Sequence, residues 1–169
     1  MSVSSSSPVR FSDSYLLSYS GEHVAYEFDM FLWLAGVCSN PSVRLGAPTP
    51  ADTLRLSYVL IESFAVHLRN VIDFLYIDRP KHSDVVAADF FDPNVWQGLR
   101  PARSSTLDDA RVRANKEIAH LTSGRITGSP PEKDWDFAGL ADEIRPLMRL
   151  VVENALATRL SPKVAAAIR

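Results

Sequence analysis

The longest helical pattern in this sequence, residues 49–77, is the feature that most constrains the fold. Thr49, Pro50 and Asp52 supply an N-cap, a proline at the first helical position and an acid in the first turn, which together favour a helix start. Apolar residues then recur at three- and four-residue steps until residues 78–80 stop the pattern. The stripe predicted to face the core comprises Leu56, Val59, Leu60, Phe64, Val71, Ile72 and Leu75. A helix this long with one apolar face must be covered by other elements.

The remaining patterns are also helical. Helical periodicity covers residues 13–39, 106–124 and 132–159, with a shorter helical piece within residues 83–91. Gly21 marks a candidate break in the first of these segments and Pro146 a candidate kink in the last. No stretch of strand length alternates apolar and polar residues, and no Asn-Gly or Asp-Gly hairpin signal is present. We therefore predict an all-α fold, an antiparallel bundle of four to five helices.

The length of 169 residues suits one domain with a single core. The serine-rich residues 1–11 are expected to form a disordered N-terminal tail. Residues 12–160 are predicted to form the helical bundle domain, and residues 161–169 a C-terminal tail.

Charge and hydropathy indicate the compartment and the classes of partner. A net charge of −2 argues against a protein that coats nucleic acid, although a local cationic pocket remains compatible with it. The longest apolar run, residues 30–38, is too short to span a bilayer, and the first ten residues lack the apolar centre of a secretory signal. The single cysteine, Cys38, cannot form an internal disulfide. We expect a cytoplasmic protein that does not bind membranes.

Residues 106–124 read as one helix. Thr106 is a candidate N-cap with Asp109 three residues later, and Gly124 suits a helix end. Its apolar side is predicted to comprise Leu107, Ala110, Ala114, Ile118 and Leu121.

The polar face of this helix carries candidate catalytic residues. Arg113 and His120 are seven residues apart, nearly two full turns of an α-helix, and so share a face. Lys116 and Glu117 lie between them on that face. A cation beside a titratable imidazole suits phosphodiester cleavage, in which one stabilises charge and the other moves a proton. The same residues also fit a solvated helix face.

Residues 67–73 place polar side chains within the apolar part of the 49–77 helix. His67 and Asn70 lie on its core-facing side, where burying either one without a partner costs about 1–3 kcal/mol. His67 is therefore expected to serve the fold, and the alternative is that His67 and Asn70 line a cleft. Arg69 and Asp73, four residues apart, are expected to form an exposed pair.

Metal chemistry has two candidate patterns. Glu117 and His120 have the Glu-x-x-His spacing of di-iron bundles, but such sites need two of these pairs and two further glutamates. A zinc site formed by His23, His67 and His120 is the other alternative. The sequence also lacks a glycine-rich phosphate loop, a Gly-x-Ser-x-Gly elbow and a Cys-x-x-Cys pair. We expect no metal and no other cofactor.

Arg113 and His120, with six residues between them on a late helix, resemble the Arg-x(4–6)-His motif of the HEPN superfamily. The likeness covers roughly residues 54–152 and includes the segment 67–76. It implies a helical bundle in which the arginine and histidine of two protomers meet and cleave RNA without a metal, often in toxins or phage-defence nucleases. Ala114 stands where the family usually has a polar residue.

The resemblance also implies roles for individual residues. His120 would act as general acid or base, and its titration near neutral pH suits that role. Arg113 would stabilise charge on the phosphate. The residues expected to position the substrate are Asn115, Lys116, Arg69 and Asn70.

Two functional hypotheses follow. The first is a HEPN-like, metal-independent endoribonuclease of a toxin or phage-defence type. The alternative is a catalytically silent helical module for dimerisation or interaction. The expected partners are a second copy of the chain, RNA, and an antitoxin or other partner protein. The homodimer is inferred from that family pattern and from the aromatic residues Phe28, Phe31, Trp33 and Trp135.

Overall fold

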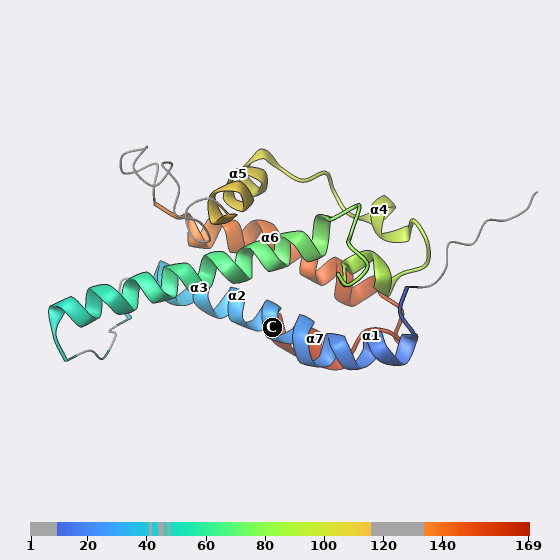
Figure 1. The fold of residues 1–169 in the computed structure, drawn as a ribbon, viewed down its shortest axis with the longest axis horizontal. Helices are drawn as coiled ribbons and strands as arrows, with labels where there is room; N and C mark the ends of the chain where they lie inside the picture. Colours follow the sequence, from blue (N-terminus) through green and yellow to red (C-terminus); the bar gives the residue numbers. More distant parts are fainter. Residues whose placement is uncertain (1–9, 41, 44–45, 47, 116–133) are drawn as a thin grey trace, which may run out of the picture.

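The computed structural model describes residues 10–40, 42–43, 46, 48–115 and 134–169 (Figure 1). Every regular element within these ranges is helical, which confirms the predicted all-α fold. The elements, in chain order, are α1 (Asp13–Tyr19), the π-helical segment η1 (Ser20–Val24), α2 (Ala25–Ser39), α3 (Pro50–Tyr76), the 3₁₀ turn η2 (Ala87–Phe90), α4 (Val95–Leu99), α5 (Ser105–Arg113), α6 (Phe137–Asn154) and α7 (Pro162–Ala167). Within the described ranges, no helix has both the length and the apolar character needed to cross a membrane.

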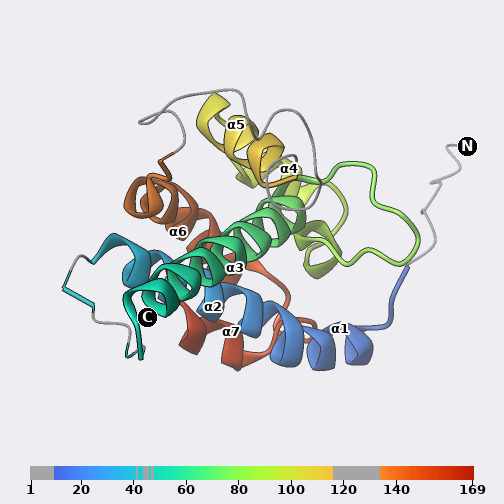
Figure 2. The ribbon, with the colours of Figure 1, turned by 60° about the vertical axis from the view of Figure 1, so that its left-hand side comes forward.

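Helix α2 occupies the centre of the bundle, where it contacts α3, α6 and α7. Helix α5 packs on α3 and lies on the opposite side of α3 from α2 (Figure 2). Between α2 and α3, the rings of Phe31 and Phe64 stack with centroids 5.6 Å apart, and Phe28 meets Phe74 edge to face. Ile144 of α6 is fully buried in the same core. Aromatic packing between α2 and α3 therefore forms the middle of the fold.

Helix α3 begins as the sequence predicts. The Thr49 hydroxyl accepts a hydrogen bond from the Asp52 amide at 3.1 Å, and Pro50 takes the first helical position. The carboxyl half of α3 is buried, but its amino half extends beyond the other helices (Figure 1). The prediction that Leu56 and Val59 face the core is wrong, because their side chains are 40% and 58% exposed.

The segment predicted as one helix over residues 13–39 is helical throughout, with a change of pitch in the middle. At the candidate break Gly21 the chain widens into π geometry, and the Ala25 amide donates to the Ser20 carbonyl. A Cβ atom at Gly21 would lie 2.9 Å from the Ser161 hydroxyl. The glycine therefore permits the residue before α7 to approach this turn closely.

Helix α5 begins two residues earlier than predicted. The Ser104 hydroxyl, and not that of Thr106, caps the helix by accepting a hydrogen bond from the Leu107 amide at 3.1 Å. Both are good capping residues, and Leu107 comes to lie in the core in the observed frame. The buried residues of the predicted apolar side are Leu107, Ala110 and Ala114. The other predicted members of this helix, including Ile118, Leu121 and Gly124, lie outside the described residues.

The last long helix, predicted over residues 132–159, is shorter in the structure. The Asp136 carboxylate caps α6 by accepting from the Gly139 amide at 2.8 Å, and the helix ends at Asn154. Pro146 lies inside α6 at an exposed position.

The expectation of a C-terminal tail over residues 161–169 is wrong. The Ser161 hydroxyl caps α7, and Val164 and Ile168 are buried in the common core. The apolar side chains of this short helix have a place against α2, so tertiary packing stabilises a helix too short to be stable alone.

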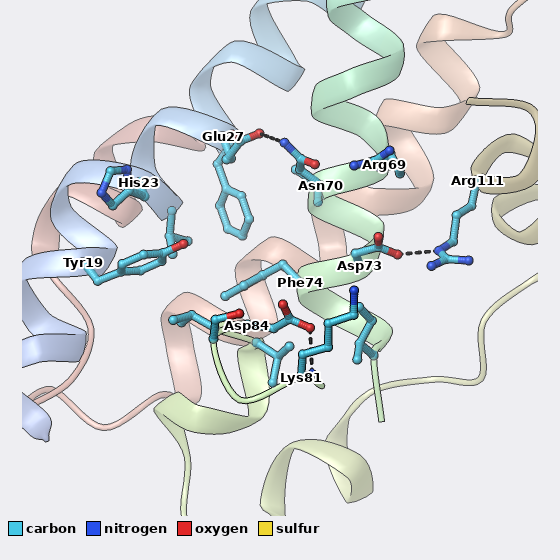
Figure 3. A pocket seen from close by; sticks show the side chains of 17 residues that line it. Tyr19, His23, Glu27, Arg69, Asn70, Asp73, Phe74, Lys81, Asp84 and Arg111 are labelled. Atoms are coloured by element: carbon cyan, nitrogen blue, oxygen red, sulfur yellow. Dashed lines mark hydrogen bonds and ion pairs between the residues drawn. The ribbon is translucent and has the colours of Figure 1, made fainter. Parts of the chain in front are cut away.

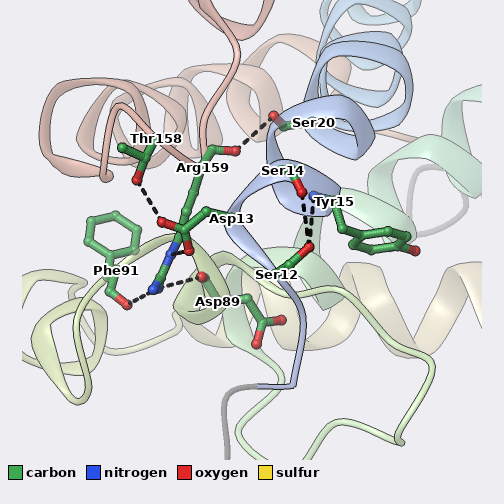
Figure 4. Close-up of polar contacts among 9 residues, drawn as sticks. All are labelled: Ser12, Asp13, Ser14, Tyr15, Ser20, Asp89, Phe91, Thr158 and Arg159. Carbon is green, nitrogen blue, oxygen red and sulfur yellow. Dashed lines mark hydrogen bonds and ion pairs between the residues drawn. The ribbon is translucent and has the colours of Figure 1, made fainter.

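Polar contacts around Arg159 hold the start of α1 to the chain before α7 (Figure 4). Its Nε donates to the Asp13 carboxylate at 2.7 Å, and its Nη1 donates to the carbonyls of Asp89 and Phe91. Thr158 also donates to Asp13. The hydrogen bonds from Arg159 and then Thr158 lower the pKa of Asp13 below its usual range. Three segments distant in sequence, around residues 13, 90 and 159, therefore meet at one guanidinium.

The N-terminal tail predicted over residues 1–11 can be compared with the structure only at its end, because residues 1–9 lie outside the described ranges. Phe11 packs partly buried against the core, and Arg10 donates to the Asp84 carbonyl and pairs with Asp89 at 3.4 Å. Residues 10 and 11 therefore belong to the folded domain, which corrects that boundary.

His67 is buried in α3, as its place on the apolar stripe indicates. Its side chain is 10% exposed, and Nδ1 lies 2.7 Å from Glu27 Oε2 of α2. Since a carboxylate only accepts hydrogen bonds, Nδ1 is the protonated nitrogen of this pair. The Tyr26 ring meets the imidazole edge to face at 5.5 Å. The predicted need for a partner is thus met across the α2–α3 contact.

We predict that His67→Ala lowers the free energy of unfolding by about 1–3 kcal/mol, because it leaves a cavity and removes a partner of Glu27. Urea unfolding monitored by circular dichroism measures the change. The matched control is His82→Ala, since His82 is exposed in a loop and its loss should cost about 0.5 kcal/mol or less. Equal stabilities of the two variants would contradict a structural role for His67.

Candidate functional site

Arg113, the predicted phosphate-binding cation, ends the α-helical part of α5. Its guanidinium lies over the Trp135 ring, 4.2 Å from the centroid, and Nη1 donates to the Asp134 carbonyl at 2.9 Å. Stacking and hydrogen bonding therefore fix the plane of the guanidinium without removing its charge.

The shared face of Arg113 and His120 stays a prediction. His120, Lys116 and Glu117 lie outside the described residues. A shared face requires α geometry from residue 113 to residue 120, whereas Ala114 and Asn115 already lie in a wider π turn.

Two of the predicted positioning residues meet where α3 packs on α5. Arg69 Nη1 donates to Asn115 Oδ1 at 3.1 Å, and one turn away Asp73 forms an ion pair with Arg111. From the first pair to the second, the residue number increases on α3 and decreases on the α5 side, so the two helices run antiparallel here. We call these four residues the α3–α5 seam. The expected pair between Arg69 and Asp73 is wrong, because each side chain finds its partner on α5.

Asn70, the third described positioning residue, lies beside this seam. Its Nδ2 donates to Glu27 Oε2 at 3.3 Å, the same oxygen that pairs with His67. Asn70 also lines a pocket, whereas His67 is not among the lining residues. The alternative that both residues line a cleft therefore holds for Asn70 alone.

The pocket has a volume of about 620 Å³ and lies between η1, α2, α3 and the loop after α3, with Arg111 of α5 at one edge (Figure 3). The predicted residues Arg69 and Asn70 line it. Its other polar walls come from side chains that the sequence reasoning did not connect: Tyr19, His23, Glu27, Asp73, Lys81, Asp84 and Arg111. No local motif joins these residues. Among these side chains, Tyr19, His23 and Glu27 share a helical face by their spacing, since they follow one another at four-residue steps.

Tyr19 and His23 form an aromatic wall of the pocket. Their ring centroids are 4.7 Å apart with planes inclined at 49°. Burial first, and then repulsion from the Tyr15 phenolate form and the carboxylates of Glu27 and Asp84, raises the pKa of Tyr19. Its phenol is therefore protonated at neutral pH and can donate a hydrogen bond.

Among the described residues, no group of three or more histidine, cysteine, aspartate or glutamate side chains could hold a metal ion. The His23 ring lies against Tyr19 in a tilted arrangement, and His67 pairs with Glu27. The proposed three-histidine site also requires His120, which is not described, and so remains untested.

Comparison with known proteins adds no relative to this picture: no family model, no curated protein and no solved structure matches the chain. The relationship to the HEPN superfamily accordingly stays an expectation from the sequence motif.

We predict that Asp73 and Arg111 are energetically coupled by about 0.5–1 kcal/mol, because their side chains are only 25% and 31% exposed. A double-mutant cycle with Asp73→Ala and Arg111→Ala, measured by urea unfolding, gives the coupling. The exposed pair of Asp52 and Arg55 within α3 is the control, with an expected coupling of about 0.3 kcal/mol. A coupling near zero would mean that this pair does not help to hold α5 on α3.

Proposed function

We propose that the protein is a HEPN-like, metal-independent endoribonuclease, of a toxin or phage-defence type, that uses Arg113 and His120. The observation that carries this proposal is the α3–α5 seam. Three residues expected to position the substrate, Arg69, Asn70 and Asn115, come from two helices and gather beside a polar pocket. Asn115 is two residues from Arg113, so this cluster adjoins the predicted catalytic helix end.

The chemistry requires few groups. RNA supplies its own nucleophile, the 2′-hydroxyl, so a site without a metal needs a proton acceptor or donor and a cation beside the phosphate. In the proposal, the 2′-oxygen attacks the phosphorus and the bond to the 5′-oxygen breaks. His120 accepts the 2′-hydroxyl proton or donates one to the departing 5′-oxygen, the other proton exchanging with water, and Arg113 stabilises the charge that develops on the phosphate. The stacking of Arg113 on Trp135 supports this role, because a guanidinium already held in place loses little freedom when a phosphate binds.

We predict that the purified protein cleaves single-stranded RNA in the presence of EDTA, and that His120→Ala and Arg113→Ala each lower the rate at least about a hundredfold. Gel analysis of a labelled RNA measures the rate, and melting curves verify that each variant folds. His82→Ala and Arg149→Ala are the matched controls, since both side chains are exposed away from the α5 end. Equal rates in the catalytic and control variants, or no cleavage by the parent protein, would rule out this activity.

A second candidate function, dimerisation or protein interaction, is favoured by exposed apolar side chains on α2 and α3. Tyr26 and Trp33 of α2 are each 53% exposed, and Val59 and Val66 of α3 are 58% and 46% exposed. We call these four residues the outer α2–α3 face. Phe28 and Phe31, which the sequence argument also counted toward an interface, are instead buried in the core.

The arrangement of the outer α2–α3 face suits a second copy of the chain. Tyr26 and Trp33 are seven residues apart, as are Val59 and Val66, which is the spacing of a helix–helix seam. Two packed helices from each protomer can pair across a two-fold axis as a four-helix bundle, so that the same patch serves both partners. Such a dimer is compatible with the nuclease and with a silent module.

We predict that the protein sediments as a dimer at micromolar concentration, and that Trp33→Glu or Val66→Glu shifts it to monomer, because each buries a charge in an apolar contact. The control is Val95→Glu, on α4, whose side chain is 42% exposed away from this face. Sedimentation velocity distinguishes the species. A parent protein that sediments only as monomer would exclude the dimer, and a control that dissociates equally would exclude this face as its interface.

A further inference from the structure

The pocket between η1, α2, α3 and the following loop combines an aromatic wall with a cationic one (Figure 3). Its volume of about 620 Å³ falls within the range of small-molecule sites, about 300–1,000 Å³. Tyr19 and His23 stand on one side, and Lys81 extends on the other side toward Asp73 and Arg111.

The carboxylates of this pocket already have partners. Glu27 accepts hydrogen bonds from His67 and Asn70, and Asp73 accepts one from Arg111. The Asp84 carboxylate accepts the backbone amide of Lys81 at 2.8 Å. Each of these carboxylates therefore has at least one hydrogen-bond donor beside it.

The donors of the pocket are less fully used. Within the described part of the chain, the Lys81 ammonium and the Tyr19 hydroxyl make no hydrogen bond, and Arg69 Nε is buried without a partner. Arg111 bonds Asp73 through Nε, and a guanidinium carries four further N–H donors. These unused donors suit an anionic group rich in acceptors, and a phosphate is such a group.

The aromatic side chains of the pocket can stack with a planar ring of a ligand. Unpaired RNA bases commonly stack on tyrosine and histidine, and each such stack contributes about 1–3 kcal/mol. A ligand with a phosphate at one end and an aromatic ring at the other therefore matches both walls.

We propose that this pocket binds one unpaired ribonucleotide of an RNA substrate, with its base against Tyr19 and His23 and its phosphate between Lys81 and Arg111. This inference rests on the proposed ribonuclease function and names a binding subsite for it. Lys81 and Tyr19 are the residues to vary, because Arg111 also holds α5 through Asp73.

Fluorescence anisotropy of a labelled, single-stranded oligonucleotide with 2′-O-methyl riboses tests the proposal, because this probe lacks the nucleophile and is not cleaved. Lys81→Ala and Tyr19→Leu should each raise Kd about tenfold. Lys81→Ala should also reduce the slope of log K against log salt by about 0.7, since one phosphate contact to a single strand is lost. The controls are Lys163→Ala and Tyr58→Leu, at exposed positions on α7 and α3.

The proposal would be overturned if the two pocket variants bound the oligonucleotide with the same Kd as the controls and with an unchanged salt slope. Adenosine monophosphate in competition separates the sources of the phosphate. If it binds in a Lys81-dependent way while the oligonucleotide does not bind, the pocket serves a free nucleotide and the RNA assignment fails. These outcomes are independent of cleavage: parent protein that binds the oligonucleotide through Lys81 but never cuts RNA supports the subsite and refutes the nuclease.

Discussion

The packing of α2 against α3 is the contact on which the rest of the structure depends. The stacked rings of Phe31 and Phe64 lie at its centre, and the hydrogen bond between Glu27 and His67 closes its edge. The other surfaces of α2 support α6 and α7, so removing α2 would expose the apolar faces of three helices. The same contact forms the pocket, because it brings Glu27 of α2 beside Asn70 of α3.

The sequence predicted those parts of the fold that are set by local interactions. The start of α3 depends on a threonine cap and a following proline, which act within one turn. The apolar periodicity predicted its length, although Leu56 and Val59 in its amino half are exposed. The cap of α5 was misplaced because Ser104 and Thr106 are both good capping residues, so the local sequence does not select between them. Ser161 and Pro162 repeat the cap-and-proline pattern that starts α3, but so short a helix is stabilised by the burial of Val164, which the local sequence does not show.

In the candidate site too, the sequence predicted what depends on local position and missed what depends on contacts between distant segments. The placement of His67 on an apolar stripe was enough to predict burial and the need for a partner, but Glu27, 40 positions away, could not be inferred. The four-residue spacing of Arg69 and Asp73 suggested an ion pair within α3. Arg69 instead bonds Asn115, and Asp73 pairs with Arg111 of α5. The pocket walls depend on how a loop and three helices meet, which the sequence alone does not show. Arg69 and Asn70 could therefore be predicted as site residues, whereas Tyr19 and Lys81 could not.

The uneven burial along α3 has a consequence for its dynamics. Backbone amides in the carboxyl half, around Ile72, can exchange with solvent only when the core opens, because the side chains there are fully buried. In the amino half, around Leu54 and Tyr58, few tertiary contacts oppose local unwinding. Hydrogen exchange should therefore slow from one end of this single helix to the other. A molecule bound to the amino half would slow hydrogen exchange there, so the exchange rates along α3 would show whether that half is occupied.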